Sequence, residues 1–579
     1  MKPRWTIHPP AMDQCQSLAL ELGIAHLTAQ CLINRGFGHP GQAATFLEPR
    51  LKLLEDPFRL PNVERAVERL LQALDRGENL VIFGDYDVDG VTATALLETS
   101  LKSLGWQVRH YLPRRHEEGY GLTRGALESC LCGDPPDLLI AVDCGSTSNE
   151  LVDWLRTQYV DVIVVDHHQL TSPPPDAYAL VNPQLDTSAA PHGRELCSVG
   201  IAFKLLHALV KRGRELGLRR FSALDLKDSL DLVALGTVAD LVPLTGENRI
   251  LVHAGLKRIE STSLPGLIAL KEVAQTRSPI GTYEVGFQLA PRLNAAGRLE
   301  TAEAALELLV APDEEIARPL ALALDATNRE RQDIERRMSD TALARVRESF
   351  NPENDWAVVE ASPDWHLGVV GIVAARISRE VYRPTFILGP DGDGWRGSGR
   401  SIAGFDLAEA LRACDHLLVR HGGHAMAAGV SLKADQLEAF RTHLNQVARE
   451  RMNPSVLVPE LRLDAIAPLH DLTVERVTEL ARLAPFGSQN PPIQLCVAGV
   501  HLARPPQRLG RELQHWKLWV TTGGPAIETL WWGSGQEPAP HGVFDVAVAP
   551  SIDTYGGRTS VKFKLLDWRP SVPSNGSHP

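Results

Sequence analysis

The sequence predicts an α/β protein with two lobes of alternating strands and helices, a long helix between the lobes and a β-rich region after them. Short apolar runs separated by helical segments fill the first lobe, namely LVIF at 80–83, LLIAV at 138–142 and VIVV at 162–165. Buried strands that alternate with helices are typical of a parallel sheet. A second pattern of this kind begins at Trp356, and short β-type runs with turns begin at Val456. The last runs predict a small barrel or sandwich.

The remaining elements follow in order along the chain. Residues 1–62 are expected to form an N-terminal extension, since turn-like residues precede a helical pattern at 63–75. The charged stretch from Ile316 to Ser349 has almost no helix breakers and predicts the helix between the lobes. The expected boundaries are 63–248 for the first lobe, 249–350 for a helical connector, 351–452 for the second lobe, 456–570 for the β-rich domain and 571–579 for a disordered tail.

Composition restricts the class of protein. Of the 579 residues, 44% are hydrophobic and 22% charged, as in globular proteins of several domains. There is no apolar run of about 18 residues and no secretory signal pattern, so we expect a cytoplasmic protein without a membrane span. The eight cysteines form no CxxC pair. The net charge of −12 disfavours nucleic-acid binding, but cation-binding carboxylates would account for part of it, and binding needs only a local basic patch.

The segment VIFGDYDVDGVTA places Asp85, Asp87 and Asp89 directly after a predicted strand and before a helix. Three carboxylates within five residues repel each other unless cations neutralise them, and hard cations such as Mg²⁺ or Mn²⁺ prefer oxygen ligands. The alternatives are a solvated acidic turn and a fragment of an EF-hand, although the glutamate that ends an EF-hand loop is missing. The segment therefore predicts a metal site.

Further acids end two neighbouring strands. Asp143 follows LLIAV, and Asp166 follows VIVV together with His167 and His168. Because ligands bind at the carboxyl ends of the strands in an open parallel sheet, these residues should converge with the first three acids. Asp240 lies in the apolar segment LVALGTVADLVPL, where a carboxylate needs a partner such as a metal. For the histidines, the alternative is one core residue and one surface residue, but an adjacent acid favours a metal or phosphate contact.

Several ordered motifs resemble those of a known family. DYDVDG, AVDCGS, VVDHHQ and the GTVAD segment resemble the four motifs of the DHH phosphoesterases. HGGHAMAAG at 421–429 resembles the signature of the associated DHHA1 domain, and PRLNAAGRLETA at 291–302 resembles a segment of the branch that degrades single-stranded DNA. The resemblance covers nearly the whole chain. It implies a DHH lobe, a DHHA1 lobe and a C-terminal β-barrel of oligonucleotide-binding type.

The resemblance also implies a metal-dependent reaction. Two Mn²⁺ or Mg²⁺ ions would be bound by Asp87, Asp89, Asp143, Asp240 and His167, with Asp143 bound to both ions. Asp85 would be a further ligand or a support for the ligands, and Asp166 and His168 would orient the site. One ion would lower the pKa of a water, and both would stabilise the charge that develops on the attacked phosphate.

The implied activity is an exonuclease that degrades single-stranded DNA from 5′ to 3′, releases 5′-mononucleotides and acts in recombination and repair. The residues expected to bind the phosphates are Arg115, Arg292, Arg298, Ser398 and Arg400, although an arginine is more often a solvated surface group. Gly422, Gly423 and His424 are expected to let the DNA backbone approach closely, with a tight structural turn as the alternative.

The C-terminal domain supplies four tryptophans as candidate stacking platforms, namely Trp516, Trp519, Trp531 and Trp532. Trp516 and Trp519 should face opposite sides of one strand. The expected partners are single-stranded DNA, a single-strand-binding protein and a helicase, and the expected state is a monomer. Two alternatives remain open, a DHH phosphoesterase for small substrates and a non-catalytic scaffold. The additional C-terminal domain disfavours the first, and the intact acids disfavour the second.

Overall fold

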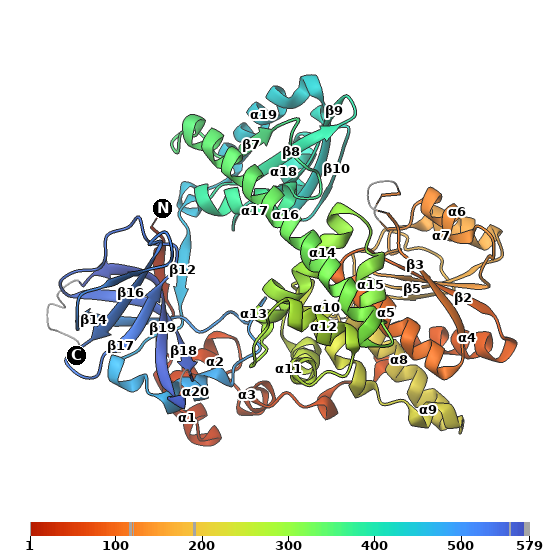
Figure 1. Cartoon of the computed structure of the whole chain (residues 1–579), viewed down its shortest axis with the longest axis horizontal. Coiled ribbons are helices and arrows are strands. Elements are labelled where there is room, and N and C mark those ends of the chain that lie inside the picture. Colours follow the sequence, from red (N-terminus) through yellow and green to blue (C-terminus); the bar gives the residue numbers. More distant parts are fainter. Residues whose placement is uncertain (1, 115–117, 120, 189–192, 555–556, 572–579) are drawn as a thin grey trace. The chain divides into compact units, whose positions relative to one another are not determined.

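The computed structural model describes residues 2–114, 118–119, 121–188, 193–554 and 557–571 (Figure 1). The chain divides into two compact units. We call residues 49–333 and 485–491 the parallel-sheet unit, and residues 1–48, 334–484 and 492–579 the composite unit. Each unit is described by itself.

A parallel sheet of five strands forms the centre of the parallel-sheet unit. The strand order is β3-β2-β4-β5-β6, with β2 at Asn79–Gly84, β3 at Gln107–Tyr111, β4 at Leu138–Val142, β5 at Asp161–Val165 and β6 at Ala179–Val181. All neighbouring strands are parallel, and the three apolar runs in the sequence form β2, β4 and β5. Because the chain continues from β2 to β3 on one side and then to β4 on the other, the strand order reverses between β2 and β4.

Helices cover both faces of this sheet, as Figure 1 shows. Ile82, Ile140 and Ile163 share a hydrophobic cluster with α4 (Val63–Arg76), α5 (Val88–Leu104) and α8 (Ser198–Glu215). The alternate residues Phe83 and Leu139 share another cluster with α6 (Arg124–Leu131) and α7 (Asn149–Thr157). Successive strand residues point to opposite faces, so a strand buried on both faces is apolar at every position.

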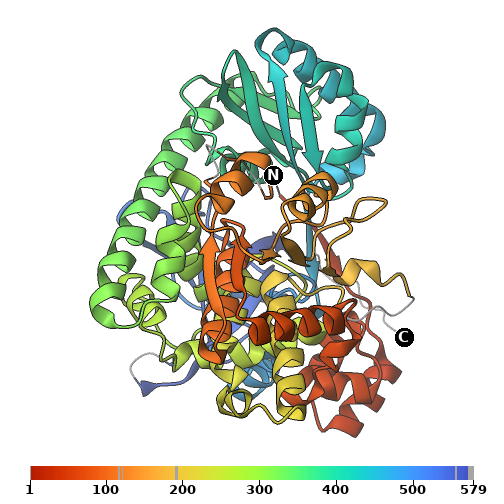
Figure 2. The same cartoon turned by 90° about the vertical axis from the view of Figure 1, so that its right-hand side faces the viewer.

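The rest of this unit is helical. It contains α9 (Arg219–Ala223), α10 (Leu230–Ala239), α11 (Gly246–Glu260), α12 (Pro265–Val273), α13 (Thr282–Glu284), a π-helix (Val285–Leu289), α14 (Ala290–Leu299) and α15 (Glu303–Leu309). The long helix α16 (Glu314–Ser349) follows and confirms the predicted charged helix; it is light green in Figure 2. Within the described residues, no helix is both long enough and apolar enough to cross a membrane.

The composite unit contains a mixed sheet in the order β10-β11-β9-β8-β7. Its strands are β7 (Val358–Ala361), β8 (Thr385–Asp391), β9 (Gly394–Arg400), β10 (Arg420–Gly423) and β11 (Ala427–Lys433), and only β7 and β8 pair in parallel. The helices that pack on it are α17 (Val370–Val381), α18 (Leu407–Ala413) and α19 (Leu437–Arg451). The second predicted α/β lobe is therefore present.

A seven-stranded sheet completes the composite unit. Its strands are β13 (Ala465–Ile466), β14 (Leu495–Leu502), β15 (Gln507–Leu509), β16 (His515–Thr521), β17 (Ile527–Trp531), β18 (Phe544–Asp553) and β19 (Ser560–Pro570). The order is β13-β14-β18-β19-β17-β16-β15, and β14 also pairs with β16. This additional pairing closes five strands into a ring, so the region is a barrel rather than a sandwich.

The beginning of the chain packs with residues more than 400 positions later. Strand β1 (Arg4–Ile7) pairs in parallel with β12 (Glu460–Leu463), and three helices follow, namely α1 (Met12–Leu22), α2 (His26–Asn34) and α3 (Pro40–Leu47). The backbone N–H of Ala25 donates to Glu479 Oε1 at 2.8 Å, on helix α20 (Val474–Ala481). The predicted extension 1–62 is thus divided, because residues 1–48 belong to the composite unit and the remainder to the parallel-sheet unit.

An imidazole joins three elements of the parallel-sheet unit. His110 on β3 contacts Glu98 of α5 at 2.8 Å through Nδ1 and Glu303 of α15 at 2.6 Å through Nε2. The hydrogen bonds to Glu303 and Glu98 raise the pKa of His110 to about 9, although burial opposes the shift. His110 therefore binds its proton more tightly in the folded state than in the unfolded chain, where the pKa of histidine is about 6.5.

We expect this contact to stabilise the fold fully below about pH 6.5 and to lose its contribution as the pH rises through about 9. The midpoint of thermal unfolding should therefore fall more steeply with pH in the parent protein than in His110→Gln over that window. Other titrating groups act equally on both proteins, so the difference between the two curves isolates His110. Parallel curves would contradict the assignment.

Candidate metal centre

The predicted acids lie at the carboxyl edge of the parallel sheet. Asp85 follows β2, Asp143 follows β4 and Asp166 follows β5, so the first two flank the point where the strand order reverses. Asp143 has a φ of +62°, in the left-handed region that few residues other than glycine adopt. Its backbone N–H still donates to Val165 O at 3.0 Å, so the turn stays attached to β5. This strained backbone directs the carboxylate of Asp143 into the site.

The loop between β2 and α5 is shaped by short local contacts. Asp87 caps α5, with its Oδ1 accepting from the backbone N–H of Asp89 at 2.9 Å and of Gly90 at 3.2 Å. A Cβ at position 90 would lie 2.7 Å from Asp85 O, so only glycine fits there. The loop therefore holds three acids on one tight turn at the start of a helix.

The N-terminus of α8 holds two of the carboxylates. The backbone N–H groups of Ser198 and Val199 donate to the two oxygens of Asp89 at 2.7 and 2.8 Å. The hydroxyl of Ser198 donates to Asp143 Oδ1 at 2.8 Å. Neither Ser198 nor Val199 was predicted from the sequence. Every residue except proline has a backbone N–H, so the residue type does not reveal this contact, and a single serine outside a motif does not indicate a site. Asp240 directly follows the last residue of α10 and caps this helix.

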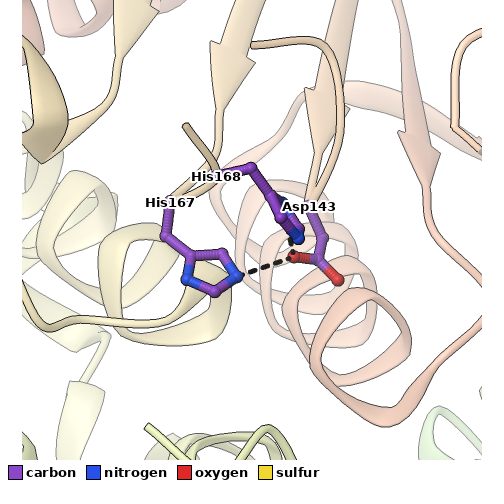
Figure 3. Close-up of side chains that lie close together, drawn as sticks. All are labelled: Asp143, His167 and His168. Atoms are coloured by element: carbon purple, nitrogen blue, oxygen red, sulfur yellow. Dashed lines mark ion pairs between the residues drawn. The ribbon is translucent and has the colours of Figure 1, made fainter. Parts of the chain in front are cut away.

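The two histidines face the same carboxylate, as Figure 3 shows. His167 Nε2 lies 3.6 Å from Asp143 Oδ1 and 3.7 Å from Asp240 Oδ2. His168 Nδ1 lies 2.8 Å from Asp166 Oδ1 and 3.9 Å from Asp143 Oδ1. Adjacent residues therefore have different partners, since His168 is bonded to Asp166 while His167 lies between two acids beyond hydrogen-bond distance.

The donor set fits hard divalent cations. Among the described residues, the buried atoms His167 Nε2 and Asp240 Oδ2 have no hydrogen-bond partner. A buried polar atom without a partner costs free energy, and binding a metal ion would remove that cost. Carboxylate oxygens with one or two imidazoles suit Mn²⁺ and Mg²⁺. Three groups bring ligand atoms within 4.8 Å of one another, namely Asp143 with His167 and His168, Asp89 with His167 and Asp240, and Asp85 with Asp87 and Asp143.

The carboxylates of the site repel each other in a buried environment. Burial and then the charges of neighbouring aspartates raise the pKa of Asp89 to about 7 and that of Asp240 to about 9. The same causes raise the pKa of Asp143 well above its ordinary value. A divalent cation beside these groups favours their charged form, so the site gains most from binding positive charge.

The surroundings of the two adjacent histidines shift their pKa values in opposite directions. Burial and the charge of His168 lower the pKa of His167 to about 4, so its imidazole is neutral and able to bind a metal. Burial would lower the pKa of His168, but the hydrogen bond and charge of Asp166 outweigh it and raise the pKa to about 9. Burial would likewise raise the pKa of Asp166, but the hydrogen bond from His168 holds it below its ordinary value.

The residues predicted to bind phosphate do not form one group within a single unit. Arg115 lies outside the described residues. Arg292 is held by Asp325 at 2.9 Å, and Arg298 lies on the same helix, α14, in the parallel-sheet unit. Ser398 and Arg400 both lie on β9 in the composite unit.

Arg400 and Ser398 meet at the start of α17. A Cβ on Gly371 would lie 3.0 Å from the guanidinium of Arg400 and 3.4 Å from Ser398 Cβ. Burial lowers the pKa of Arg400, and its guanidinium donates to Gly399 O at 2.9 Å. A half-buried arginine beside a helix N-terminus is suited to bind an anion.

The remaining candidates have mixed surroundings. Gly422 and His424 are exposed, and Gly423 has a φ of +135° with a Cβ position only 2.5 Å from Ala427 O. The turn between β10 and β11 therefore accounts for Gly423 without a ligand. In the barrel, Trp519 and Trp531 are buried, Trp532 is exposed, and Trp516 is half-buried with Arg508 over its ring at 4.4 Å.

Three domain families match the chain. A model of the DHH family, N-terminal domain, matches residues 79–237, a model of the DHHA1 domain matches residues 354–450, and a model of the RecJ OB domain matches residues 463–567.

Characterised relatives match nearly the whole chain. The chain is 37% identical to the single-stranded-DNA-specific exonuclease RecJ of Bacillus subtilis, over 98% of this chain and 71% of that protein. It is 36% identical to the Escherichia coli protein of the same name, over 96% of each. The crystal structure of RecJ in complex with Mn²⁺ from Thermus thermophilus matches with a TM-score of 0.83 at 32% identity, covering 100% of this chain and 81% of that one.

The parallel sheet with its acids and paired histidines, followed by a DHHA1 domain, defines a metal-dependent phosphoesterase of the DHH class. The chain belongs to the RecJ family of single-stranded-DNA-specific exonucleases. The predicted fold class is confirmed, with its two lobes and its barrel of oligonucleotide-binding type. Mn²⁺ or Mg²⁺ as the cofactor is confirmed as well, since Thermus thermophilus RecJ structures contain either ion.

The Ser198 hydroxyl gives a test of how the ligands are oriented. We expect Ser198→Ala to weaken Mn²⁺ binding by about tenfold, because a group that hydrogen-bonds a metal ligand typically contributes that much. The backbone bonds to Asp89 persist in this variant, so the effect isolates the contact with Asp143. Calorimetric titration with Mn²⁺ measures it, with Ser100→Ala, equally buried on α5, as the matched control. Equal affinities in both variants would exclude the role.

Proposed function

We propose that this protein degrades single-stranded DNA from its 5′ end by metal-dependent hydrolysis, releases 5′-mononucleotides and acts in DNA recombination and repair. The observation that carries the proposal is the cluster of the buried Asp89 and Asp143 with the half-buried Asp240 and His167 at the edge of the parallel sheet. It occurs in a chain whose relatives over most of its length are named single-stranded-DNA-specific exonucleases.

The ligands that we assign to two ions are Asp87, Asp89, Asp143, Asp240 and His167. Bound there, the ions would lower the pKa of the attacking water and offset the charge that develops on the phosphate. Asp143 belongs to two of the three groups of ligand atoms, which supports its assignment as the ligand of both ions. Asp85 belongs to one group and would complete the ligands or support them.

Residues around the cluster orient the metal ligands. Asp166 accepts the Nδ1 proton of His168 and also the backbone N–H of Ser146 at 3.1 Å, so both side chains are fixed. A protonated His168 beside the acids offers positive charge to a phosphate oxygen at neutral pH. Ser198 fixes the carboxylate of Asp143, and the N-terminus of α8 fixes Asp89. These contacts hold the ligands in place before substrate binds.

The anion site at Arg400 supports recognition of a strand end. A terminal 5′-phosphate carries more charge than an internal phosphodiester, and Ser398, Arg400 and the first N–H groups of α17 offer donors to it. We assign this site to the 5′-phosphate. Arg115, Arg292, Arg298 and the loop of Gly422, Gly423 and His424 are proposed as further contacts to the strand.

The domain assignments and partners are proposals of the same kind. Residues 63–248 would carry the chemistry, 351–452 would bind the strand near its end, and the barrel at 456–570 would hold the following nucleotides. A cytoplasmic monomer that acts with a single-strand-binding protein and a helicase would suit an enzyme that needs strands already separated.

We expect Asp143→Asn to reduce hydrolysis at least about 100-fold, since loss of a ligand charge shared by two ions raises the barrier by several kcal/mol. Asparagine tolerates the positive φ of this position, so the fold should persist. Release of nucleotides from a single strand in Mn²⁺ measures the loss, with the exposed Asp153→Asn as control. Activity above about 1% would contradict the shared-ligand assignment.

Direction and strand preference are tested with end-labelled DNA. We expect a 5′ label to be released at once as a mononucleotide and a 3′ label to appear only at the end of digestion. Chelator should abolish both, and blunt duplex should resist. Degradation from the 3′ end, or cleavage of pyrophosphate or a cyclic dinucleotide with no cleavage of DNA, would overturn the proposal.

A further inference from the structure

Two exposed aromatic rings lie together on the surface of the parallel-sheet unit. Tyr283 on α13 and Phe287 on the π-helix are 62% and 70% exposed. Their ring centroids are 5.0 Å apart and their planes differ by 29°, so the rings stack. Residues four apart share one face of a helix, and this face points to solvent. Single exposed apolar residues are common on protein surfaces, but two exposed rings in contact form a small contiguous patch, and such patches can mark a binding site.

The local backbone explains why the pair is held rigidly. Residues 282–299 form one helical run in which Pro291 follows the π-helix. A proline ring clashes with the carbonyl four residues earlier, here that of Phe287, and a wider turn relieves this clash. On the buried side, Val285 and Leu289 belong to the main hydrophobic cluster. The rings therefore project from a fixed base rather than from a loop.

The same helical run is packed against the metal centre. A Cβ on Gly286, which lies between the two aromatic positions, would be 3.8 Å from Val238 Cγ1. Val238 precedes Asp240 by two residues, a rise of about 3 Å along a helix axis. At the other end of the run, a Cβ on Gly297 would be 2.7 Å from Tyr86 O, in the loop of the first acids. The aromatic pair thus lies on an element that contacts two sides of the site.

We propose that Tyr283 and Phe287 form a stacking platform for a base of the single strand close to the scissile phosphate. The inference rests on the proposed function and deepens it by adding a contact that recognises unpaired bases. Stacking on aromatic rings is independent of base identity and requires a base that is not enclosed in a duplex. The platform would therefore help to select a single strand without selecting its sequence.

The size of the pair disfavours a protein partner. Two aromatic side chains offer at most about 300–500 Å², whereas a stable protein interface buries about 800 Å² on each side. The neighbouring positions on the run also turn inward, since Glu284 caps the helix through a bond to Gly281 N at 2.8 Å and Arg292 is held by Asp325. A single base fits a platform of this area.

The test compares aromatic and aliphatic replacements. Tyr283→Ala and Phe287→Ala, alone and together, are examined beside Phe287→Trp and Phe287→Leu. Asp143→Asn in every protein slows cleavage at least about 100-fold, so that the Kd for a single strand can be measured in Mn²⁺ before the strand is degraded. We expect the alanine variants and Phe287→Leu to bind about tenfold more weakly and Phe287→Trp to bind as the parent does. Tyr159→Ala, at a 95% exposed tyrosine of the same unit, is the matched control and should leave the Kd unchanged.

A second measurement locates the base. In proteins with Asp143 intact, we expect the alanine variants to raise KM about tenfold and to leave kcat within about twofold, as expected for loss of binding alone. A strand with an abasic nucleotide at the stacked position should bind parent and variants alike, because the interaction is already lost. Equal Kd values for parent and alanine variants, or equal losses with Trp and Leu, would overturn the platform.

The outcomes also separate the two proposals. A parent protein that neither binds nor degrades single strands overturns the proposed function and the platform together. A parent that degrades them while the variants are unaffected overturns the platform alone. If the parent self-associates in sedimentation experiments and the alanine variants become monomeric without a change in Kd for DNA, the pair is an interface between copies and the platform is wrong.

Discussion

The arrangement of the parallel-sheet unit depends on the repulsion between carboxylates that are buried side by side. Asp89, Asp143 and Asp240 would not all carry charge in this environment without compensation. Part of the compensation comes from the backbone N–H groups at the start of α8, and the rest must come from cations. The sheet topology makes the cluster feasible, because the strand order reverses between β2 and β4, which is where open parallel sheets bind their ligands.

The two adjacent histidines show how one short segment serves two chemical purposes. The hydrogen bond and charge of Asp166 raise the pKa of His168, whereas burial, and after it the charge of His168, lowers the pKa of the neighbouring His167. In the proposed mechanism, the segment would offer one imidazole to a metal and the other to a phosphate. Neither property follows from the residue type alone, since both depend on which ring lies against Asp166.

Sequence alone predicted those features that depend on local patterns. Apolar runs located β2, β4 and β5, and the carboxyl ends of these parallel strands were correctly expected to bring Asp85, Asp143 and Asp166 to one edge of the sheet. These predictions succeeded because strand burial and strand ends are visible in a few consecutive residues.

Features that depend on distant contacts or on the backbone were missed. The N–H groups of Ser198 and Val199 bind Asp89 through atoms that every residue except proline has, so no side chain marks them. Arg292 forms its ion pair with Asp325, which lies 33 residues later. Residues 1–48 and residues 49–62 belong to different units because they contact different parts of the chain. The glycine at 423 is explained by a turn whose other half is Ala427, which a motif cannot distinguish from a ligand contact.

The parallel pairing of β1 with β12 has a consequence for the order in which the protein is made. The parallel-sheet unit is encoded almost without interruption, apart from residues 485–491, and most of its contacts can form as the chain emerges. The first strand, in contrast, has no partner until residue 460 has been synthesised. During translation this four-residue strand therefore stays without its native partner while the parallel-sheet unit can already fold, so the composite unit is completed last.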